Sequence, residues 1–506
     1  MAQQLYFSRD TKMFLEFDNV VWEIPVLDGF SFSQATNSSE ITLNEMESSG
    51  GVSRRGRRAF NDSLAAGEWS FSTYVRPFTA TGSAQGTGSA DTAAKVHAIE
   101  EALWALMAGA KDYVPGSSSK YQATPTGGSA TDVATPHASA ATFDVNFGMS
   151  NVSALATFNL YFVLGDSNRT IMKLDGCVVG EASIDFDIDG IATIAWSGNC
   201  ANVKDFTGST VSAASDDVVK NVTVNGAVSS GATTITLSAS HGAVVGDLLF
   251  GTGLPATGAP ITNVNTNAMT VAATSGAISD GATLIKRKAT GDGTAVSVGD
   301  VFLDSDDSHR LFVFTGSAGF VPVSETKTNY VNEAITNTTN FIRNRLTVLD
   351  VALSSSQRDP DGDGTNELES SYSLTLTGGN VTVSNNITFI TPEEIGIVNV
   401  PIGHVTGTRS VSGSFTCYLT EDTSTTNASR DFFEDLRDIT NVVTNSFDLT
   451  FKIGGASGTG LELEMPTCHV EIPTHSIEDV ISLETNFQAL PSTIDGTNEL
   501  LLKYRP

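Results

Sequence analysis

Apolar and polar residues alternate along two distant stretches of the chain, and the two stretches match. Apolar side chains fall at positions 158, 160, 162 and 164 of the first stretch and at 447, 449, 451 and 453 of the second. Alternation with a period of two predicts a β-strand with one buried face. Each strand is followed by a cysteine, Cys177 or Cys468, and nineteen residues after the cysteine by an aromatic residue, Trp196 or Phe487. We infer that one β-rich unit occurs twice.

The same order of elements precedes both stretches. A strand pattern at 68–75 is followed by an apolar stripe with helical spacing over 93–108, and a strand pattern at 415–419 is followed by such a stripe over 429–439. A stripe of this kind predicts an amphipathic helix packed on a sheet. Residues 115–141 are rich in Ser, Thr, Ala, Gly and Pro, which predicts a loop. Further strands are predicted at 13–17, 20–24, 30–32, 345–352, 372–376, 381–390 and 409–419.

The chain between the two copies has a different texture. Short apolar runs there lie between turns rich in Gly, Ser, Asn and Pro, which predicts one small all-β module, or two. The pattern therefore divides the chain into a first β domain (1–204), an inserted all-β module (205–330) and a second β domain (331–506). The expected fold class is mainly β, with two similar sandwich or barrel domains, each carrying one flanking α-helix, and the inserted module.

The composition is strongly acidic. The 57 Asp and Glu residues against 28 Lys and Arg give a formal net charge of −29. Such a chain repels free nucleic acid, although an acidic wall suits a surface that DNA must pass without sticking. The four cysteines form no Cys-x-x-Cys pair, which favours buried thiols over a zinc site or a disulfide framework. With no basic leader and no apolar run of about 18 residues, we expect a soluble chain made in the cytoplasm.

Acidic residues occupy alternate positions in two of the expected strands. Asp185, Asp187 and Asp189 alternate with apolar residues, and Glu462 and Glu464 do the same. A strand in either place would bury its apolar side and expose a row of carboxylates. Ordinary solvated sheets mix both signs of charge. We therefore predict an acidic surface shared by both copies, and the alternative is a chance run on a free face.

Basic residues are concentrated in one polar segment, residues 34–67. Arg54, Arg55, Arg57 and Arg58 fall within five positions of an otherwise acidic molecule. Opposite charge on identical copies favours self-association. We predict an arm that docks on an acidic neighbour, with a solvated hairpin as the alternative.

One motif could bind a metal, and no motif indicates catalysis. Asp359, Asp361, Asp363 and Gly364 follow the Asp-x-Asp-x-Asp-Gly order of a calcium loop, but the twelfth position is Ser370 instead of glutamate. An acidic turn without metal is the favoured interpretation, and calcium the alternative. The chain has no Gly-x-Ser-x-Gly, no His-Glu-x-x-His and no phosphate-binding loop. We expect no enzymatic activity and no cofactor, although paired carboxylates could in principle hydrolyse a glycoside.

The N-terminal half resembles a known family. The residues that carry the likeness are Glu-Ile-Pro-Val-Leu-Asp-Gly-Phe-Ser-Phe-Ser-Gln at 23–34, the arginine-bearing loop, Phe-Asn-Asp-Ser-Leu at 60–64, Glu-Trp-Ser-Phe-Ser-Thr-Tyr-Val-Arg-Pro at 68–77 and the single helix after them. Together they resemble the tail tube proteins of tailed bacteriophages. The likeness covers residues 12–200 well and 340–506 more weakly, and it does not cover the insertion.

The resemblance implies a β-sandwich or barrel whose copies join edge to edge in hexameric rings around a β-lined channel. A chain with two units is then expected to complete a pseudo-six-fold ring as a homotrimer. Stacked rings would conduct genomic DNA during ejection, with the acidic rows at 185–189 and 462–464 lining the channel. The 34–67 segment would reach the adjacent subunit or ring. Closing the ring would also remove the exposed strand edges.

The same resemblance sets expectations for partners and location. The partners would be further copies of the chain and the terminator, tape measure and tail-tip proteins, and DNA would pass without specific binding or any membrane insertion. The protein would be assembled in the host cytoplasm and reside in the virion tail. A protruding insertion would crowd a contractile sheath, which favours a non-contractile siphovirus tail. The alternatives are a tail-tip or baseplate ring protein of the same fold and a glycan-binding adhesin-like β protein.

Overall fold

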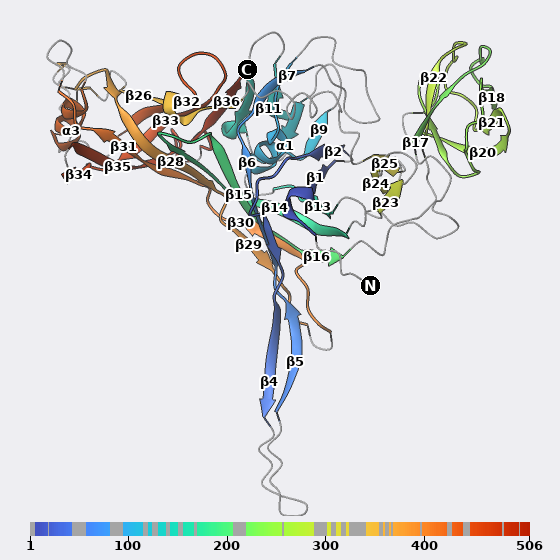
Figure 1. The fold of residues 1–506 in the computed structure, drawn as a ribbon, viewed down its shortest axis with the longest axis horizontal. Coiled ribbons are helices and arrows are strands. Elements are labelled where there is room, and N and C mark those ends of the chain that lie inside the picture. The colour runs from blue at the N-terminus through green and yellow to red at the C-terminus, as the bar shows by residue number, and fades with distance from the viewer. Residues whose placement is uncertain are drawn as a thin grey trace, which may run out of the picture.

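The structure is a computed structural model, and it is mainly β, as the alternation predicted (Figure 1). No helix in the part of the chain it describes is long and apolar enough to cross a membrane. It describes residues 6–18, 20–42, 57–80, 95–114, 120–123, 130–137, 142–149, 155–165, 170–205, 219–255, 258–287, 301–304, 310–314, 320–322, 341–353, 358–359, 364–365, 368–394, 397–421, 428–438, 446–477, 480–494 and 496–506.

The elements that the sequence predicted recur in the structure, with two exceptions in the first half and several additional strands. The first half contains η1 (Ser8–Asp10), β1 (Lys12–Phe17), β2 (Val20–Glu23), β3 (Ser31–Ser33), β4 (Thr36–Thr42), β5 (Arg57–Leu64), β6 (Gly67–Tyr74), β7 (Pro77–Ala80), β8 (Lys95–Ala98), α1 (Glu101–Met107), β9 (Asp112–Val114), β10 (Lys120–Ala123), β11 (Thr131–Pro136), β12 (Phe143–Asn146), η2 (Phe147–Met149), β13 (Phe158–Leu164), β14 (Thr170–Asp187), β15 (Thr193–Cys200) and β16 (Asn202–Asp205). The middle contains β17 (Val219–Thr223), β18 (Thr234–Thr236), β19 (Leu248–Phe250), β20 (Ala259–Asn265), β21 (Ala268–Val271), β22 (Thr283–Arg287), β23 (Val301–Asp304), β24 (Arg310–Phe314) and β25 (Phe320–Pro322). The second half contains η5 (Asn344–Leu346), β26 (Val348–Ala352), β27 (Ser371–Leu374), β28 (Leu376–Ser384), β29 (Ile387–Ile390), β30 (Gly403–Thr406), β31 (Ser410–Tyr418), α3 (Ser429–Asp438), β32 (Phe447–Ile453), β33 (Gly460–Val470), β34 (Thr474–Ile477), β35 (Ile481–Ala489) and β36 (Leu501–Arg505).

The two halves share one pattern of strand pairing. In the first, β1 pairs with β2 and β13, and β13 pairs with β14. In the second, β26 pairs with β27 and β32, and β32 pairs with β33. Phe158 lies opposite Cys177 and Phe447 opposite Cys468, and each ladder shifts by one residue at the next step. A bulge at the same point of both ladders is the mark of a shared design, and we infer that the two halves are copies of one unit.

Strand pairing corrects the expected match between Trp196 and Phe487. Trp196 lies opposite Phe71 of β6. The residue of the second half that matches Phe71 is Phe415 of β31, and it lies opposite Thr485. Thr485 is therefore the counterpart of Trp196, and the equal spacing of nineteen residues between cysteine and aromatic ring was misleading.

In each half, a large aromatic residue lies opposite a glycine on the neighbouring strand. The strand that carries the aromatic residue differs between the two halves. Trp69 of β6 lies opposite Gly198 of β15, whereas Gly413 of β31 lies opposite Phe487 of β35. A Cβ at Gly198 would come within 2.5 Å of the Trp69 ring, and one at Gly413 within 2.8 Å of the Phe487 ring. Both contacts are too close, so each glycine makes room for the ring across the ladder.

Two local predictions in the first half were wrong. Residues 95–98 of the expected helix form β8, which pairs with β7, and the helix α1 begins at Glu101. All four residues of β8 are buried, and Val96 was assigned to the helix because it fits the spacing of Ile99 and Leu103 that follow it. The expected loop at 115–141 contains β10 and β11, which pair with each other. In the second half, α3 confirms the predicted helix over its described residues.

The middle of the chain forms separate β structure at the right of Figure 1. Strands β17 to β22 make one six-stranded sheet, and β23 to β25 make a three-stranded one. The six-stranded part has its own hydrophobic core, distinct from the core that the two halves share. The predicted strands of this region are thereby confirmed.

The C-terminal strand ties the two halves together. Strand β36 pairs with β33 of the second half on one side and with β12 of the first half on the other. Tyr504 of β36 is fully buried, donates a hydrogen bond to the Glu100 carboxylate at 2.5 Å and accepts one from the Trp104 indole at 2.7 Å. This network places a titratable group inside the shared core.

We expect Glu100 to make the folded protein less stable as the pH rises towards neutrality. Burial disfavours the charged carboxylate and raises the pKa of Glu100 to about 7, against the opposing effects of Tyr504 and Arg76. The unfolded chain loses this proton near pH ~4.3. Between these two pH values only the folded state holds the proton, so the free energy of unfolding falls by roughly 3 kcal/mol as pH rises through the window. Denaturant unfolding near pH ~5 and pH ~7.5 should show a smaller fall in Glu100→Gln than in the unmodified protein. An equal fall in both proteins would contradict the assignment.

Candidate functional site

One continuous sheet crosses from the first half into the second. Strands β3, β6, β15 and β14 of the first half are bonded in that order. Strand β14 then pairs with β28, which continues through β31 to β35, and β35 pairs with both β33 and β34. The outermost ladders at the two ends of this sheet are β3 on β6 and β34 on β35. Two sets of strands with the same pairing pattern therefore lie side by side in one surface.

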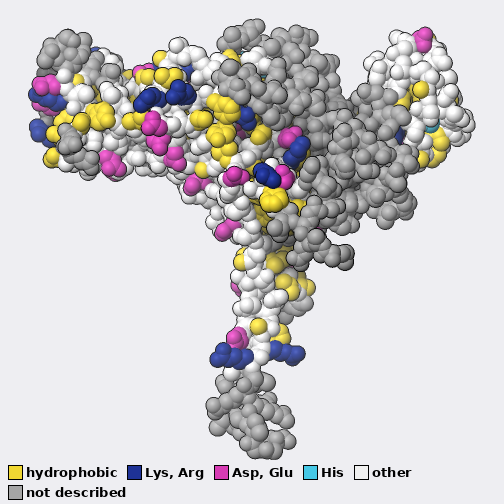
Figure 2. All heavy atoms as spheres, in the orientation of Figure 1, with side chains coloured by type: hydrophobic (Ala, Val, Ile, Leu, Met, Phe, Trp, Pro, Cys, Tyr) yellow, Lys and Arg dark blue, Asp and Glu magenta, His cyan; other side chains and the backbone are white. Residues whose placement is uncertain are grey.

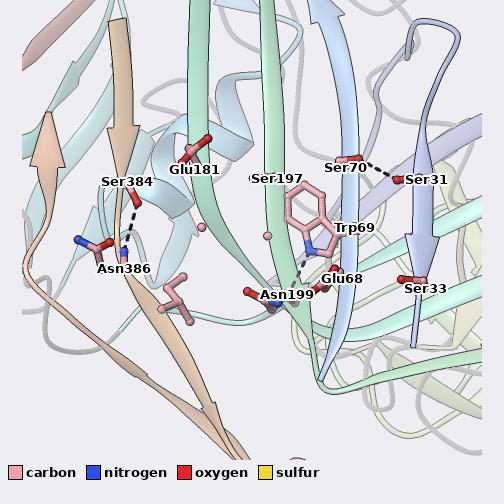
Figure 3. Close-up of a pocket in the computed structure, with 13 residues that line it drawn as sticks. Ser31, Ser33, Glu68, Trp69, Ser70, Glu181, Ser197, Asn199, Ser384 and Asn386 are labelled. Carbon is pink, nitrogen blue, oxygen red and sulfur yellow. Dashed lines mark hydrogen bonds between the residues drawn. The ribbon is translucent and has the colours of Figure 1, made fainter. Parts of the chain in front are cut away.

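One face of this sheet is polar. Along each strand, every second side chain belongs to the core and the others point to the opposite side. Figure 3 shows side chains of this second set on neighbouring strands, from Ser384 through Glu181, Ser197 and Ser70 to Ser31. We call this the polar sheet face, and in the described strands it consists of Ser31, Ser33, Glu68, Ser70, Ser72, Thr193, Ala195, Ser197, Asn199, Glu181, Ser183, Asp185, Asp187, Gly378, Asn380, Thr382, Ser384, Ser410, Ser412, Ser414, Thr416, Ser482, Glu484, Asn486 and Gln488.

Charge on the polar sheet face has a single sign. Its charged residues are all carboxylates, and the strand segments that form it contain no Lys or Arg. Most of its other side chains are hydroxyls and amides, which bond to one another across strands, as Ser31 does to Ser70 at 2.9 Å and Ser183 to Thr382 at 3.1 Å. Such a face is well hydrated and repels polyanions weakly and evenly.

Two of the three predicted aspartates belong to the polar sheet face. Asp185 and Asp187 are exposed and alternate with buried Ile184 and Phe186. Strand β14 ends at Asp187, so Asp189 lies in the turn before β15 instead of in the row. Its side chain is 90% exposed and forms an ion pair with Arg345 at 3.7 Å. Ile188, expected on the buried side, is 38% exposed because the alternation stops with the strand.

Glu462 and Glu464 lie elsewhere. They belong to the part of β33 that precedes the bulge, where β33 pairs with β32 and β36. Glu464 forms an ion pair with Lys503 at 2.5 Å, and Glu462 one with Arg505 at 3.7 Å. Burial, and then contact with Glu464, raises the pKa of Glu462. This surface mixes both signs of charge, so the expected one-signed row is absent at these two described residues.

Sequence reasoning missed most of the polar sheet face. Glu68, Glu181 and Glu484 supply further carboxylates to it, each isolated between neutral residues. The signal that could have found the face is the row Ser410, Ser412, Ser414 and Thr416, in which hydroxyls take every second position of a strand. Charge patterning alone was too narrow a guide, because hydroxyls are the commonest side chains on this surface.

Two of the four arginines of the predicted arm can be placed. Arg57 and Arg58 lie at the start of β5, which pairs with β4 in a hairpin that extends far below the body of the molecule (Figure 1). Figure 2 shows the dark blue side chains at the far end of its described part. Arg57 forms an ion pair with Glu40 of β4 at 3.3 Å, between two exposed side chains. Arg54 and Arg55 lie outside the described residues.

The calcium loop is only partly described. Asp359 accepts a hydrogen bond from the Gly364 amide, five residues further along the turn, at 2.8 Å. Asp361 and Asp363 lie outside the described residues, and within the described ones no group of three metal-ligating side chains is found. Both interpretations of this turn therefore stay open.

We expect the turn at Asp359 to fold without metal. A thermal melt in excess EGTA and one in millimolar Ca²⁺ should then give the same Tm, because a ligand that binds the folded state raises its stability with concentration. A Tm that rises with Ca²⁺ and returns to the EGTA value in Asp359→Asn would instead establish the calcium site.

Comparisons with known proteins give one long similarity. The chain matches no protein-family model. It is 25% identical over 481 residues to the tail tube protein pb6 of Escherichia phage T5. The aligned region covers 94% of this chain and 69% of that protein. The similarity extends across both halves and the region between them.

Proposed function

We propose that this chain, a relative of the phage tail tube proteins, is a structural subunit that assembles into the hollow tube of a phage tail and that its polar sheet face lines the channel. The protein acts as a wall and not as an enzyme. It resides in the tail of the virion after assembly in the host cytoplasm. DNA passes along the channel during ejection without specific binding.

The observation that carries this proposal is the charge of the polar sheet face. It runs without interruption across both halves through the β14–β28 ladder, and the strand segments that form it contain carboxylates and no Lys or Arg. The wall of a channel for DNA must lack basic side chains, because these would hold the phosphates. It also needs a hydrated surface over which the duplex can slide. The opposite face of the same sheet packs on the core, so only this face is available to a lumen.

The repeat supports a trimer. Two copies of one unit, a first β domain at 1–204 and a second at 331–506, stand side by side in the sheet, so three chains supply six units to a ring. At about 4.8 Å between strands and a tilt of about 40°, a ring of three such sheets is on the order of 50 Å across at the backbone, wide enough for a DNA duplex. Rings would stack through the hairpin β4–β5 and its arginines. The terminator, tape measure and tail-tip proteins would complete the tail.

The inserted module, residues 205–330, is proposed to decorate the outside of the tube. Its strands β17 to β22 have their own core and lie far from β28, β31 and β35 in Figure 1. An external module of this size leaves little room for a contractile sheath, which supports a non-contractile tail.

Electron microscopy of the purified protein tests the proposal. We expect long hollow tubes built from three-fold rings. Single rings that do not stack would favour a tail-tip or baseplate protein, and monomers at all concentrations would exclude a tube protein. Class averages that show the sheet's other face towards the channel would also overturn the assignment of the polar sheet face.

A further inference from the structure

The continuous sheet ends in two unsatisfied edges. Among the described strands, β3 is paired with β6 alone and β34 with β35 alone. Each therefore presents a row of backbone N–H and C=O groups without a strand beside it, which is a template for another chain. The strand β14 at the centre of the sheet would be such an edge as well, were it not for β28.

The β14–β28 ladder shows how the two units meet. Asp185 lies opposite Asn380, Phe186 opposite Gly379 and Asp187 opposite Gly378. Strand β14 corresponds to β33 and β34 of the second unit, and β28 corresponds to β3 of the first. A ladder equivalent to β14–β28 can therefore form between the free edges β34 and β3 of two copies. The chain thus contains a full example of the junction that its own ends lack.

The correspondence fixes the register. Asp185 and Ser476 each stand eight residues after their cysteine and lie opposite Thr193 and Ser482 of the neighbouring strand. At the other edge, Asn380 lies opposite Ser414 as Ser31 lies opposite Ser70. Ser476 is then the partner of Ser31, and Thr474 the partner of Ser33.

This register keeps the polar sheet face intact. Thr474 and Ser476 lie opposite Glu484 and Ser482, so they point to the same side as the polar sheet face. Ser31 and Ser33 are already members of it. A slip by one residue would set Ser476 opposite Phe30 or Phe32, whose side chains point to the other side of the sheet, so the pattern of side chains selects the stated pairing over such a slip.

An exposed isoleucine marks the apolar side of the free edge. Ile477 is 78% exposed, whereas its counterpart Phe186 is 3% exposed and packs on Phe451 of the other unit at 5.3 Å between ring centres. The counterpart of Phe451 in the first unit is Phe162, because the two occupy the same position of the matching strands β32 and β13. Phe162 stacks on Phe30, the residue immediately before β3, with 5.4 Å between the ring centres.

The sizes of the facing side chains are complementary as well. Within the chain, the large Phe186 lies opposite Gly379, where an added Cβ would come within 2.8 Å of its ring. At the free edges the counterparts are Ile477 and Phe30, a smaller residue facing a larger one. The side-chain volume of each facing pair is therefore divided differently between the two strands. The pairs of Trp69 with Gly198 and of Phe487 with Gly413 show the same exchange between the two halves.

We propose that β34 of one copy pairs with β3 of a second copy in the register that sets Ser476 opposite Ser31, seating Ile477 on Phe30 and Phe162 of that second copy. The inference rests on the proposed function, because it supplies the contact that closes the ring. It names the partner as another copy of this chain and the contact as one backbone ladder with one apolar anchor.

Engineered disulfides test the register. Residues directly opposite one another in an antiparallel ladder have Cα atoms about 4.5–5.5 Å apart, within the range that a disulfide bridges. After mild oxidation, S31C/S476C should give covalent trimers and dimers on a non-reducing gel. D185C/N380C is the matched control, because the same geometry then lies within one chain and the mass should not change. The four native cysteines are buried, and the single variants S31C and S476C should give no such bands.

A second pair tests the alternatives. S31C/T474C displaces the thiols by two residues, to roughly 7–8 Å, and should link poorly. Tubes that form normally while S31C/S476C stays unlinked, or while S31C/T474C links better, would overturn this junction and leave the tube function standing. If the unmodified protein forms no ring at any concentration, the junction and the proposed function fail together.

Discussion

Ile477→Lys is expected to yield a folded monomer that no longer forms rings or tubes. The isoleucine is 78% exposed in the single chain, so the substitution costs the monomer little. In the proposed junction the ammonium group would be buried against Phe30 and Phe162 without a partner, which costs several kcal/mol for each contact. Since every 1.4 kcal/mol is tenfold in affinity, assembly should require at least about 100 times more protein.

The matched control is Ile494→Lys. Ile494 is 98% exposed and lies in the loop after β35, away from both free edges of the sheet. It introduces the same charge at a site of even greater exposure, so it should assemble as the unmodified protein does. Sedimentation velocity measures the fraction in rings, and circular dichroism checks that both variants are folded. Tubes from Ile477→Lys at ordinary concentrations would contradict the junction.

Period-two alternation was a reliable guide wherever one face of a strand is buried and the other is not. It located β32, where burial alternates from Phe447 to Ile453. It also located β13, although Tyr161 and Val163 on the second side of that strand are buried as well. It failed at β8, because this strand is only four residues long and Val96 also fits the helical spacing of Ile99 and Leu103 that follow it. The stripe of apolar residues that resulted resembled a helix.

The site was harder to predict than the fold because its chemistry is spread over many strands. A strand with alternate carboxylates is conspicuous, and this rule selected Asp185 and Asp187, which belong to the polar sheet face, together with Glu462 and Glu464, which do not. Both rows alternate identically in sequence. What separates them is the bulge near Cys468, beyond which the strand leaves the outer ladder and joins the polar sheet face. Only the ladder, and not the spacing, shows which residues beyond a bulge belong to the polar sheet face.

Equal spacing in sequence also proved weaker evidence than equal pairing. Trp196 and Phe487 stand at the same distance from their cysteines, yet the ladders match Trp196 with Thr485. The core volume that Trp69 fills on one strand of the first half is filled by Phe487 from the neighbouring strand in the second. A repeat conserves the packed volume between strands, and either strand can supply it.

Replacing Asp185 and Asp187 together by lysine is expected to leave tubes that bind DNA tightly. Both side chains are exposed on the polar sheet face, so assembly should persist. Each Asp→Lys change adds two charge units, and the formal net charge of a chain moves from −29 to −25, still strongly acidic. The effect therefore depends on where the charges lie and not on the total. In the proposed ring the new lysines form a basic belt around the lumen, and each phosphate they neutralise strengthens binding in a salt-dependent manner.

Short duplex DNA incubated with preformed tubes and sedimented with them measures the effect. The double variant should retain DNA at low salt and release it steeply as salt is raised, whereas unmodified tubes should retain little at any salt concentration. Asp10→Lys with Glu421→Lys provides the matched control, because both residues are exposed, lie outside the polar sheet face and give the same net charge. Equal retention by the two double variants would show that Asp185 and Asp187 do not face the channel, whereas retention by the Asp185 and Asp187 variant alone requires that those two positions lie where DNA enters.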